Sequence, residues 1–425
     1  MKTVLARSCC EESSVLTPCA TDAMEDPTMR YSIVTGHWQL YRRSDSTAGK
    51  PRGYTAKTVM RGLTHELEEE GGPFALSARD DTPPEQLCYS VAAAERTASD
   101  EWCEDSASAS DESKALVRAF DNKFPMLGHA ESAAQPIEAA LVRGVHPQLS
   151  GIGRCEVVVL HWRLNWCTAI GTAAEAAAGW KAINRRYRSI AEDPRNACVL
   201  VFENHGIKSG GSLPHAHAQL WGLPLIPREQ RILYDVAIAY SRDNGGASVF
   251  ERCLQDVLVP RADSSGAAAG GSRIVHQNAA CVAFLPFAAE RYNEIWVMPR
   301  VPGACFGDAS AATLAGVADA ARACLRAIYV AHNDPTYNII VRTAPPSRAT
   351  NSPALKALCA SLVGTYRWYI QILPSTSNWS GVSLGFIVGG RDGQPEEKAA
   401  VLRALADAPL PTSDGADVDA VVDEK

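Results

Sequence analysis

Two histidines one residue apart are the clearest candidates for chemistry in this sequence. The segment SLPHAHAQLWGLP holds His215, His217 and Gln219, and no other histidines in the chain form so tight a cluster. Successive side chains of a β-strand alternate between two faces, so these three polar side chains share one face and the alanines between them share the other. An imidazole presented on such a face can act as a nucleophile.

A glycine-rich segment, FENHGIKSGGS, stands just before the histidines and ends at Ser212. Its glycines, Gly206, Gly210 and Gly211, would let backbone amides approach phosphate oxygens, and the serine hydroxyl would add a donor. Phosphoryl transfer depends mostly on positioning and charge stabilisation, which an imidazole beside an anion-binding loop supplies. The combination therefore predicts phosphoryl-group transfer.

Two alternatives compete with this interpretation of the histidines. A His-x-His strand also serves metal binding, but a metal needs a third and usually a fourth ligand. No carboxylate stands at the matching spacing, and Gln219 is a poor ligand. The histidines could also be buried for structure alone, although the adjacent loop favours function because loops carry functional residues more often than core positions do.

The elements that must position these residues occur twice along the chain, in blocks of roughly 115 to 240 and 273 to 408. Each block has an apolar run, an alanine-rich helical stretch and two further apolar runs. The helical stretches cover 171 to 190 and 308 to 331, the second with Asp308 or Ser310 as its N-cap. Related positions lie 138 apart from Glu156 to Glu294 and 139 apart from Leu200 to Ile339.

This even spacing predicts two tandem copies of one unit in the order strand, helix, strand, strand. Short neighbouring strands with one helix between them imply an α+β fold of antiparallel sheets with helices packed on one face. Ordinary α+β domains that merely share an element order are the alternative. We expect a disordered leader (1–28), a first unit with the histidines (29–240), a connecting segment (241–272), a second unit (273–408) and an acidic disordered tail (409–425). Segments 87–113 and 263–272 are expected to be loops.

Composition excludes several classes of function. Lys and Arg total 41 against 48 Asp and Glu, a formal charge of −7, so a nucleic-acid partner is not expected. The apolar runs have the length of strands, so no membrane span is expected. The thirteen cysteines are odd in number and mostly lie in apolar runs, which is typical of a reducing compartment. The N-terminal segment is a poor signal peptide, so we expect a cytoplasmic protein, although an organellar address stays open.

The combination FENHGIKSGGSLPHAHAQ resembles the signature of the galactose-1-phosphate uridylyltransferase branch of the histidine-triad superfamily, in which glutamine replaces the third histidine. The similarity extends to YSIVTGHWQLYRR near Tyr31 and VRAFDNKFPML near Val117. In the second half it includes FLPFAAERYNEIWVMPR, NDPTYNIIVRTAP and WYIQILP. The details GLPLIP and IQILP look closer to the ADP-glucose phosphorylase-like members.

The resemblance implies a role for each site residue. His217 would be the nucleophile that forms a covalent nucleotidyl-histidine, and the backbone carbonyl of His215 would orient its ring. Gln219 would hold the phosphate oxygens together with Ser212 and the amides near Gly210 and Gly211. Nucleotide contacts would come from Asn204, Asn122 and Arg43, the last of which reaches phosphate from a neighbouring subunit and therefore implies a homodimer.

The family's zinc site is incomplete in this sequence. The segment CYSVAAAE keeps Cys88 and Glu95, but Val91 stands at the second cysteine position. The expected zinc histidine is also missing, although His161 lies three residues earlier. Many members bind structural zinc at the position of His215, but two of four ligands are missing here, so we expect no structural zinc and no other cofactor.

The activity implied is nucleotidyl transfer by double displacement, from a nucleotide sugar of the UDP-hexose type to a sugar 1-phosphate. Phosphorolysis of ADP-glucose or a dinucleotide, with inorganic phosphate as acceptor, is an alternative. A non-catalytic nucleotide-binding regulatory protein is the alternative of another class. It is suggested by the missing zinc ligands and by Ser383, which stands where the family has an acidic residue near its sugar pocket.

Overall fold

The computed structural model describes residues 28–31, 38–41, 74, 82–90, 115–128, 140–142, 146–259, 272–346, 352–375 and 393–408. The predicted leader, apart from residue 28, and the predicted tail lie outside this range, as do Arg43, Val91, Glu95 and Ser383. The side chain of Cys88 is also outside the description, although its backbone belongs to a strand.

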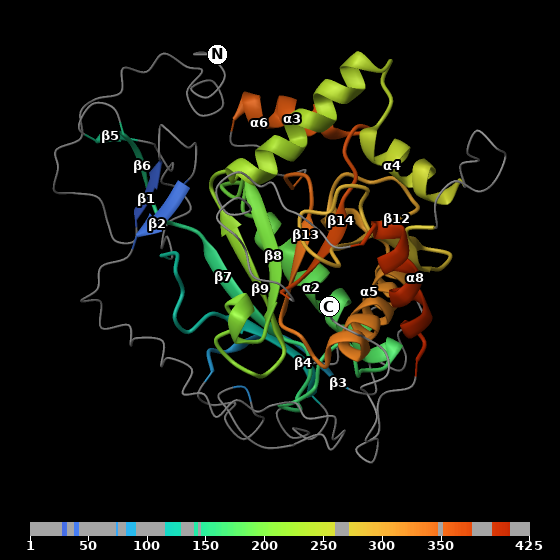
Figure 1. Cartoon of the computed structure of the whole chain (residues 1–425). Coiled ribbons are helices and arrows are strands. Elements are labelled where there is room, and N and C mark those ends of the chain that lie inside the picture. Colours follow the sequence, from blue (N-terminus) through green and yellow to red (C-terminus); the bar gives the residue numbers. More distant parts are fainter. Residues whose placement is uncertain are drawn as a thin grey trace.

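One ten-stranded sheet forms the centre of the molecule (Figure 1). All the strand pairs in it are antiparallel. The strands follow one another across the sheet in the order β10 (Ile274–Gln277), β11 (Cys281–Phe284), β12 (Ile295–Pro299), β14 (Tyr369–Pro374), β13 (Tyr337–Arg342), β8 (Cys198–His205), β9 (His217–Leu223), β7 (Arg154–Val159), β4 (Ala115–Asp121) and β3 (Glu85–Ser90).

The sheet order confirms the predicted repeat. Outward from the central pair, one half is β8, β9, β7, β4, β3 and the other is β13, β14, β12, β11, β10. Each half contains strand, helix, strand, strand in chain order, as β7, α2, β8, β9 and as β12, α5, β13, β14. Strands β8 and β13 join the halves, with Tyr337 opposite His205 and Asn338 opposite Asn204. The boundaries of the two units remain predictions.

Two long helices cover one face of this sheet, as the sequence predicts. Helix α2 (Ala173–Ala191) begins with a capping box in which Thr172 accepts from the backbone of Glu175 and the Glu175 carboxylate accepts in return. Helix α5 (Ala311–His332) takes Ser310 as its N-cap, the second of the two residues predicted. Their apolar faces pack on each other and on both half-sheets in the largest core, to which α8 (Pro395–Leu405) adds.

Further helices cover the opposite face of the second half-sheet. Helices α3 (Arg228–Asp243), α4 (Val249–Leu258) and α6 (Pro353–Leu362) gather at the top of Figure 1. They build a second core with Val282 and Phe284, whereas Cys281 and Ala283 of the same strand face the first core. The prediction of helices on one face therefore holds for α2 and α5, and these three helices add a layer that the repeat pattern did not contain.

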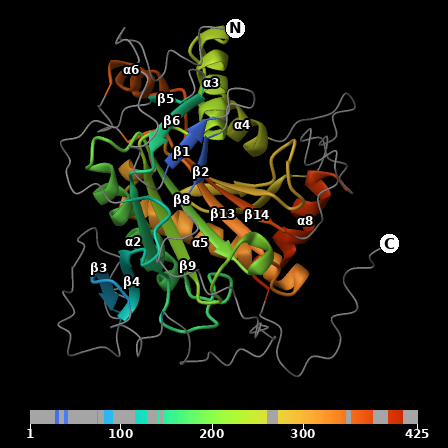
Figure 2. The same ribbon diagram turned by 90° about the vertical axis from the view of Figure 1, so that its left-hand side faces the viewer.

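A small four-stranded sheet lies beside the first unit. Its order is β2 (Trp38–Tyr41), β1 (Thr28–Tyr31), β6 (His146–Ser150), β5 (Ala140–Val142), and it lies to the left in Figure 1 and in front of β8 in Figure 2. Met29 and Leu149 of this sheet pack into a core that also contains Leu223 at the end of β9. The small sheet therefore covers the far end of β9, the strand that begins at His217.

One predicted loop begins as a strand. Residues 87–90 fall within the segment expected to be a loop, but they belong to β3, which pairs with β4. Leu87 is buried in the largest core. The average composition of 87–113 hid this strand because the polar residues that suggested a loop mostly follow it.

In the described residues no helix is long and apolar enough to cross a membrane.

Candidate active site

The ring of His217 is fixed at one nitrogen and left open at the other. Its Nδ1 lies 2.8 Å from the backbone carbonyl oxygen of His215. A carbonyl can only accept, so Nδ1 carries the hydrogen and donates it, and the lone pair lies on Nε2. Within the described residues Nε2 has no hydrogen-bond partner. This is the carbonyl contact that the family resemblance implies, and it leaves a nucleophilic nitrogen available.

Burial keeps this imidazole neutral. His217 is 5% exposed, and desolvation lowers the pKa of its side chain, while the hydrogen bond to the His215 carbonyl partly opposes that shift. The neutral form is the one whose Nε2 can attack an electrophile. The site therefore holds the reactive protonation state at neutral pH.

His215 is buried even more deeply, with 1% of its surface exposed. Its Nε2 donates to the backbone carbonyl of His161 across 2.6 Å, and burial lowers the pKa of the ring to about 4. Its Nδ1 is buried without a hydrogen-bond partner in the described part of the chain. The neutral side chain therefore links the start of β9 to the segment after β7. The backbone carbonyl of His215 is thereby held toward the ring of His217.

Phe74 packs edge-on against both imidazoles, with ring centroids 6.0 Å from His215 and 5.3 Å from His217. The backbone oxygen of Phe74 accepts a 2.7 Å hydrogen bond from Arg118, which is 1% exposed and also pairs with Glu85 at 3.2 Å. Sequence reasoning missed both residues. An arginine inside the apolar strand ALVRAFD was the available signal, since a buried guanidinium must find partners.

The described residues do not fit the zinc site that many family members have. No group of three or more His, Cys, Asp or Glu side chains among them could hold a metal ion. The Nδ1 of His161 accepts from the backbone amide of Arg163, and its Nε2 lies 3.4 Å from Glu175. Burial opposes ionisation of Glu175, but hydrogen bonds led by the one from His161 lower its pKa to about 2. His161 is thus held by protein groups at both nitrogens.

The predicted alternation of side chains is confirmed, although His215 and Ala216 precede β9, which begins at His217. Ala216, Ala218 and Leu220 lie in the core beneath the helices, so the histidines and Gln219 face the other way. On that face Gln219 stands opposite Phe202 of β8 and Val157 of β7. Gln219 is half-buried, and within the described residues its amide makes no hydrogen bond. It therefore retains its full capacity to donate to a ligand.

The backbone conformation and close contacts of the loop between β8 and β9 require glycine. Gly206 and Gly210 have φ values of 81° and 87°. A side chain at Gly211 would meet the carbonyl oxygens of Gly206 and Asn204 at 2.7 and 2.8 Å. The amides of Gly210 and Gly211 donate to Ile207 and Gly206 inside the loop. These two amides therefore close the turn. The role of amides near Gly210 and Gly211 in holding phosphate oxygens stays a prediction.

The remaining predicted residues lie at different places. Ser212 is exposed and has no hydrogen-bond partner in the described segments. The side-chain oxygen of Asn204 accepts from Asn338 across 2.7 Å. Asn122 follows β4, and its side-chain oxygen accepts from the backbone amide of Phe124 across 2.9 Å. Arg43, expected to act from a neighbouring subunit, lies outside the described residues.

A doubled α+β unit with an imidazole fixed by the preceding histidine's carbonyl is the arrangement that the resemblance to the histidine-triad superfamily implies. A structure of a uridylyltransferase superposes with a TM-score of 0.61 at 19% identity, covering 89% of this chain and 98% of that one. An Arabidopsis thaliana ADP-glucose phosphorylase with bound ADP-glucose gives 0.59 at 18% identity, with the same coverage. These similarities establish the fold.

The sequence comparison points to one family. Residues 19–227, just under half of the chain, match the family described as galactose-1-phosphate uridyl transferase, N-terminal domain. ADP-glucose phosphorylase of Arabidopsis thaliana is 26% identical over 228 residues, which are 53% of this chain and 57% of that protein. Galactose-1-phosphate uridylyltransferase of Streptomyces lividans is 29% identical over 160 residues, 37% of this chain and 42% of that protein. The chain thus matches 57% of the length of the first of these curated relatives and 42% of the length of the second.

Proposed function

We propose that the chain is a nucleotidyltransferase that acts on a nucleotide sugar by double displacement at His217. The observation that carries the proposal is the 2.8 Å contact from its Nδ1 to the His215 carbonyl, which leaves Nε2 as the lone-pair nitrogen. As Nε2 bonds to phosphorus the ring becomes positively charged, and the carbonyl dipole stabilises that charge. The contact therefore both aims the nucleophile and stabilises the intermediate.

The first step would transfer the nucleotidyl group to the protein. The Nε2 lone pair attacks the α-phosphorus, an N–P bond forms, and the bond from that phosphorus to the bridging oxygen breaks, releasing a sugar 1-phosphate. In the second step an oxygen of an acceptor phosphate attacks the same phosphorus and the N–P bond breaks. Gln219 and Ser212, whose polar groups have no partners in the described residues, would hold the phosphate oxygens as charge builds.

The relatives support two identities for the acceptor. In a uridylyltransferase it is a sugar 1-phosphate, and the donor is of the UDP-hexose type. In a phosphorylase of ADP-glucose it is inorganic phosphate, and the Arabidopsis relative that matches 53% of this chain favours this second candidate. The proposal further includes a cytoplasmic homodimer in which Arg43 reaches phosphate from the neighbouring subunit, and nucleotide contacts from Asn204 and Asn122.

A labelling experiment tests this function directly. The wild-type chain is incubated with UDP-glucose or ADP-glucose that carries radiolabel on the α-phosphate, and protein-bound label is measured after acid and after base treatment. A phosphohistidine-type bond is expected to be labile in acid and stable in base. Equal labelling of His217→Ala, or no labelling of the wild type by either donor, would favour the non-catalytic nucleotide-binding alternative.

The acceptor is identified in a second assay. Labelled protein freed of donor is mixed with glucose 1-phosphate, galactose 1-phosphate or inorganic phosphate, and the released nucleotide is identified. Release as a nucleoside diphosphate by inorganic phosphate alone would establish phosphorolysis. Release as a nucleotide sugar would establish the transferase.

A further inference from the structure

The turn between α5 and β13 of the second unit packs against the glycine loop of the first unit. Asp334 Oδ1 lies 2.8 Å from Nε2 of His205, the last residue of β8. The ring of His205 stacks on Tyr337 with centroids 4.3 Å apart and an interplanar angle of 6°. Asp334 itself has a φ of 53°, a left-handed conformation that is uncommon outside glycine. A constrained turn therefore holds the end of the strand from which the loop departs.

Asn338 of β13 fixes two points of the same loop. Its Nδ2 donates to the side-chain oxygen of Asn204 across 2.7 Å and to the backbone carbonyl of Ser209 across 2.8 Å. A carbonyl only accepts, so Asn338 must present its nitrogen there, and Asn204 must then present its oxygen. The NH₂ group of Asn204 has no part in these two bonds. Its nitrogen lies 3.9 Å from the position that a Cβ atom at Gly210 would occupy.

The loop is closed from within around the same contact. The hydroxyl of Ser209 lies 2.7 Å from the carbonyl oxygens of His205 and Gly206. Gly206, with its positive φ, leaves no room for a side chain against Thr336 of the second unit. The second unit therefore contacts the β8–β9 loop at two places, the start of the loop and Ser209. Gly210, Gly211 and Ser212 follow directly after Ser209.

We infer that Asn338 and Asp334 are positioning residues of the second unit that set the conformation of the first unit's loop and the orientation of Asn204. The inference rests on the proposed function for its catalytic consequence, in which the loop would bring Ser212 and the Asn204 NH₂ group to a phosphate beside His217. The second unit would then supply the framework that holds another unit's donors in place. Asn338 would touch no reacting atom.

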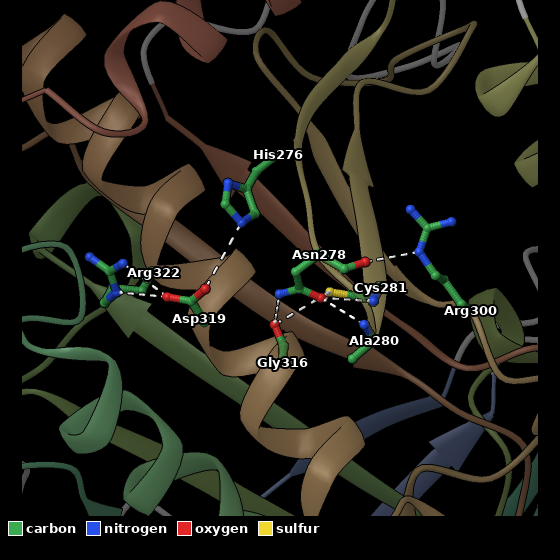
Figure 3. Close-up of polar contacts among 8 residues, drawn as sticks. All are labelled: His276, Asn278, Ala280, Cys281, Arg300, Gly316, Asp319 and Arg322. Atoms are coloured by element: carbon green, nitrogen blue, oxygen red, sulfur yellow. Dashed lines mark hydrogen bonds and ion pairs between the residues drawn. The ribbon is translucent and has the colours of Figure 1, made fainter.

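Replacement of Asn338 by aspartate tests this role because the shape is kept while both donated hydrogen bonds are lost. The chain offers a matched control in Asn278, whose Nδ2 donates to the backbone carbonyl of Gly316 across 2.7 Å (Figure 3). Asn278 joins the β10–β11 turn to α5, and its side-chain oxygen accepts from the amides of Ala280 and Cys281, which aspartate can also do. N278D therefore removes a similar amide-to-carbonyl bond within the second unit and leaves the loop untouched.

Two measurements are made on N338D, N278D and the wild type. Hydrogen exchange of the peptide that spans 206–212 reports on the loop without requiring any activity. Loss of two hydrogen bonds is expected to speed exchange in this peptide by about tenfold in N338D. The rate of His217 labelling at saturating donor is expected to fall by about tenfold as well. N278D should match the wild type in both measurements, although its thermal midpoint should fall by about as much as that of N338D.

The outcomes separate the two hypotheses. Fast loop exchange in N338D together with slow labelling supports the positioning role. Fast loop exchange in N338D with no labelling of any protein, wild type included, would support the inference that Asn338 positions the loop but would overturn the proposed function. Equal exchange and equal labelling in N338D and N278D would overturn the inference. If N338D does not fold, N338S and N278S are used in place of the two aspartate variants, because they remove the same bonds without adding a charge.

Discussion

The two halves of the sheet have the same strand order, yet they treat their polar side chains differently. On β9 of the first unit, Gln219 has no hydrogen-bond partner in the described residues, and His217 uses only one ring nitrogen. On β14, the equivalent strand of the second unit, Gln371 donates to Glu294 across 2.7 Å and accepts from Arg342 across 2.8 Å. The first unit therefore leaves polar groups of this strand free to bind a ligand, whereas the second unit satisfies its own within the protein.

Glu294 makes the contrast sharper because it is a buried carboxylate that could have formed a second site. It is 1% exposed, and it accepts hydrogen bonds from the backbone amides of Glu290 and Arg291 and from the indole of Trp296 as well as from Gln371. A carboxylate with this many donors is held in a fixed geometry. In the second unit these bonds organise the sheet, which is the role we infer for that unit as a whole.

Loss of the nucleophile should give the largest effect. His217→Asn keeps a side chain that can donate to the His215 carbonyl but provides no nucleophilic nitrogen. We expect nucleotidyl transfer to fall by at least about 10⁴-fold. Turnover is measured with the donor that labels the wild type. Gln371→Ala, on the equivalent strand of the second unit, is the control and should keep turnover within a few fold; a comparable loss there would break the comparison.

Acid should destabilise the fold through the buried histidine pair. The pKa of His215 is about 4 in the folded chain against 6.5 when unfolded, so the unfolded state takes up the proton first as the pH falls. The free energy of unfolding is therefore highest above pH 6.5 and decreases by about 3 kcal/mol toward pH 4. The pKa of His217 is lowered in the same direction as that of His215.

Urea unfolding at intervals between pH 7.5 and 4.5 measures this dependence. His215→Gln should flatten the curve in that range. Loss of the Glu175 contacts does not interfere, because its pKa of about 2 and its usual value of 4.5 place that change at lower pH. An unchanged slope in His215→Gln would show that other groups cause the loss of stability.

Removal of the unpaired amide of β9 should have an intermediate effect. Gln219→Ala takes away a donor to phosphate oxygens, and we expect the rate of His217 labelling to fall by about 10²-fold with little change in stability. The second-unit counterpart is expected to behave in the opposite way: Gln371→Ala should lower stability by about 1 kcal/mol because Glu294 and Arg342 lose a partner. Single-turnover labelling and thermal unfolding are compared for both variants.

Strain in the glycine loop should have a small effect on stability. Gly210→Ala places a side chain at a φ of 87° and should cost about 1 kcal/mol. Gly245→Ala places one at a φ of 63°, after α3, where no atom lies close enough to collide. Both variants should lose similar stability, but only Gly210→Ala should slow labelling. Equal labelling would mean that the conformation at Gly210 does not matter to the chemistry.

The sequence predicts much of the fold because its signals are local. The alternation around His217 determines which side chains face the site, and the capping residues Thr172 and Ser310 mark where the two long helices begin. The repeat follows from element order and even spacing. By contrast, the contacts of Phe74 with the histidine pair depend on a segment far away in the sequence, so no local pattern could predict them.

The same reason explains what was missed in the loop. The glycines of FENHGIKSGGS indicate an unusual backbone, but not which acceptors its amides choose. Those of Gly210 and Gly211 turn inward, and the residue that anchors the loop is Asn338, 129 positions beyond Ser209. The register between β8 and β13 brings Asn338 there. Such register is set by packing of the whole sheet rather than by either segment.

The junction of β8 and β13 has a consequence for any attempt to divide the molecule. These strands are neighbours in the middle of the sheet, so cutting the chain between the units would give each half a bare strand with unpaired amides and carbonyls. A separated first half would tend to join another copy of itself along β8, in place of the lost β13. Its histidine would survive such self-association while the anchor of its loop would not.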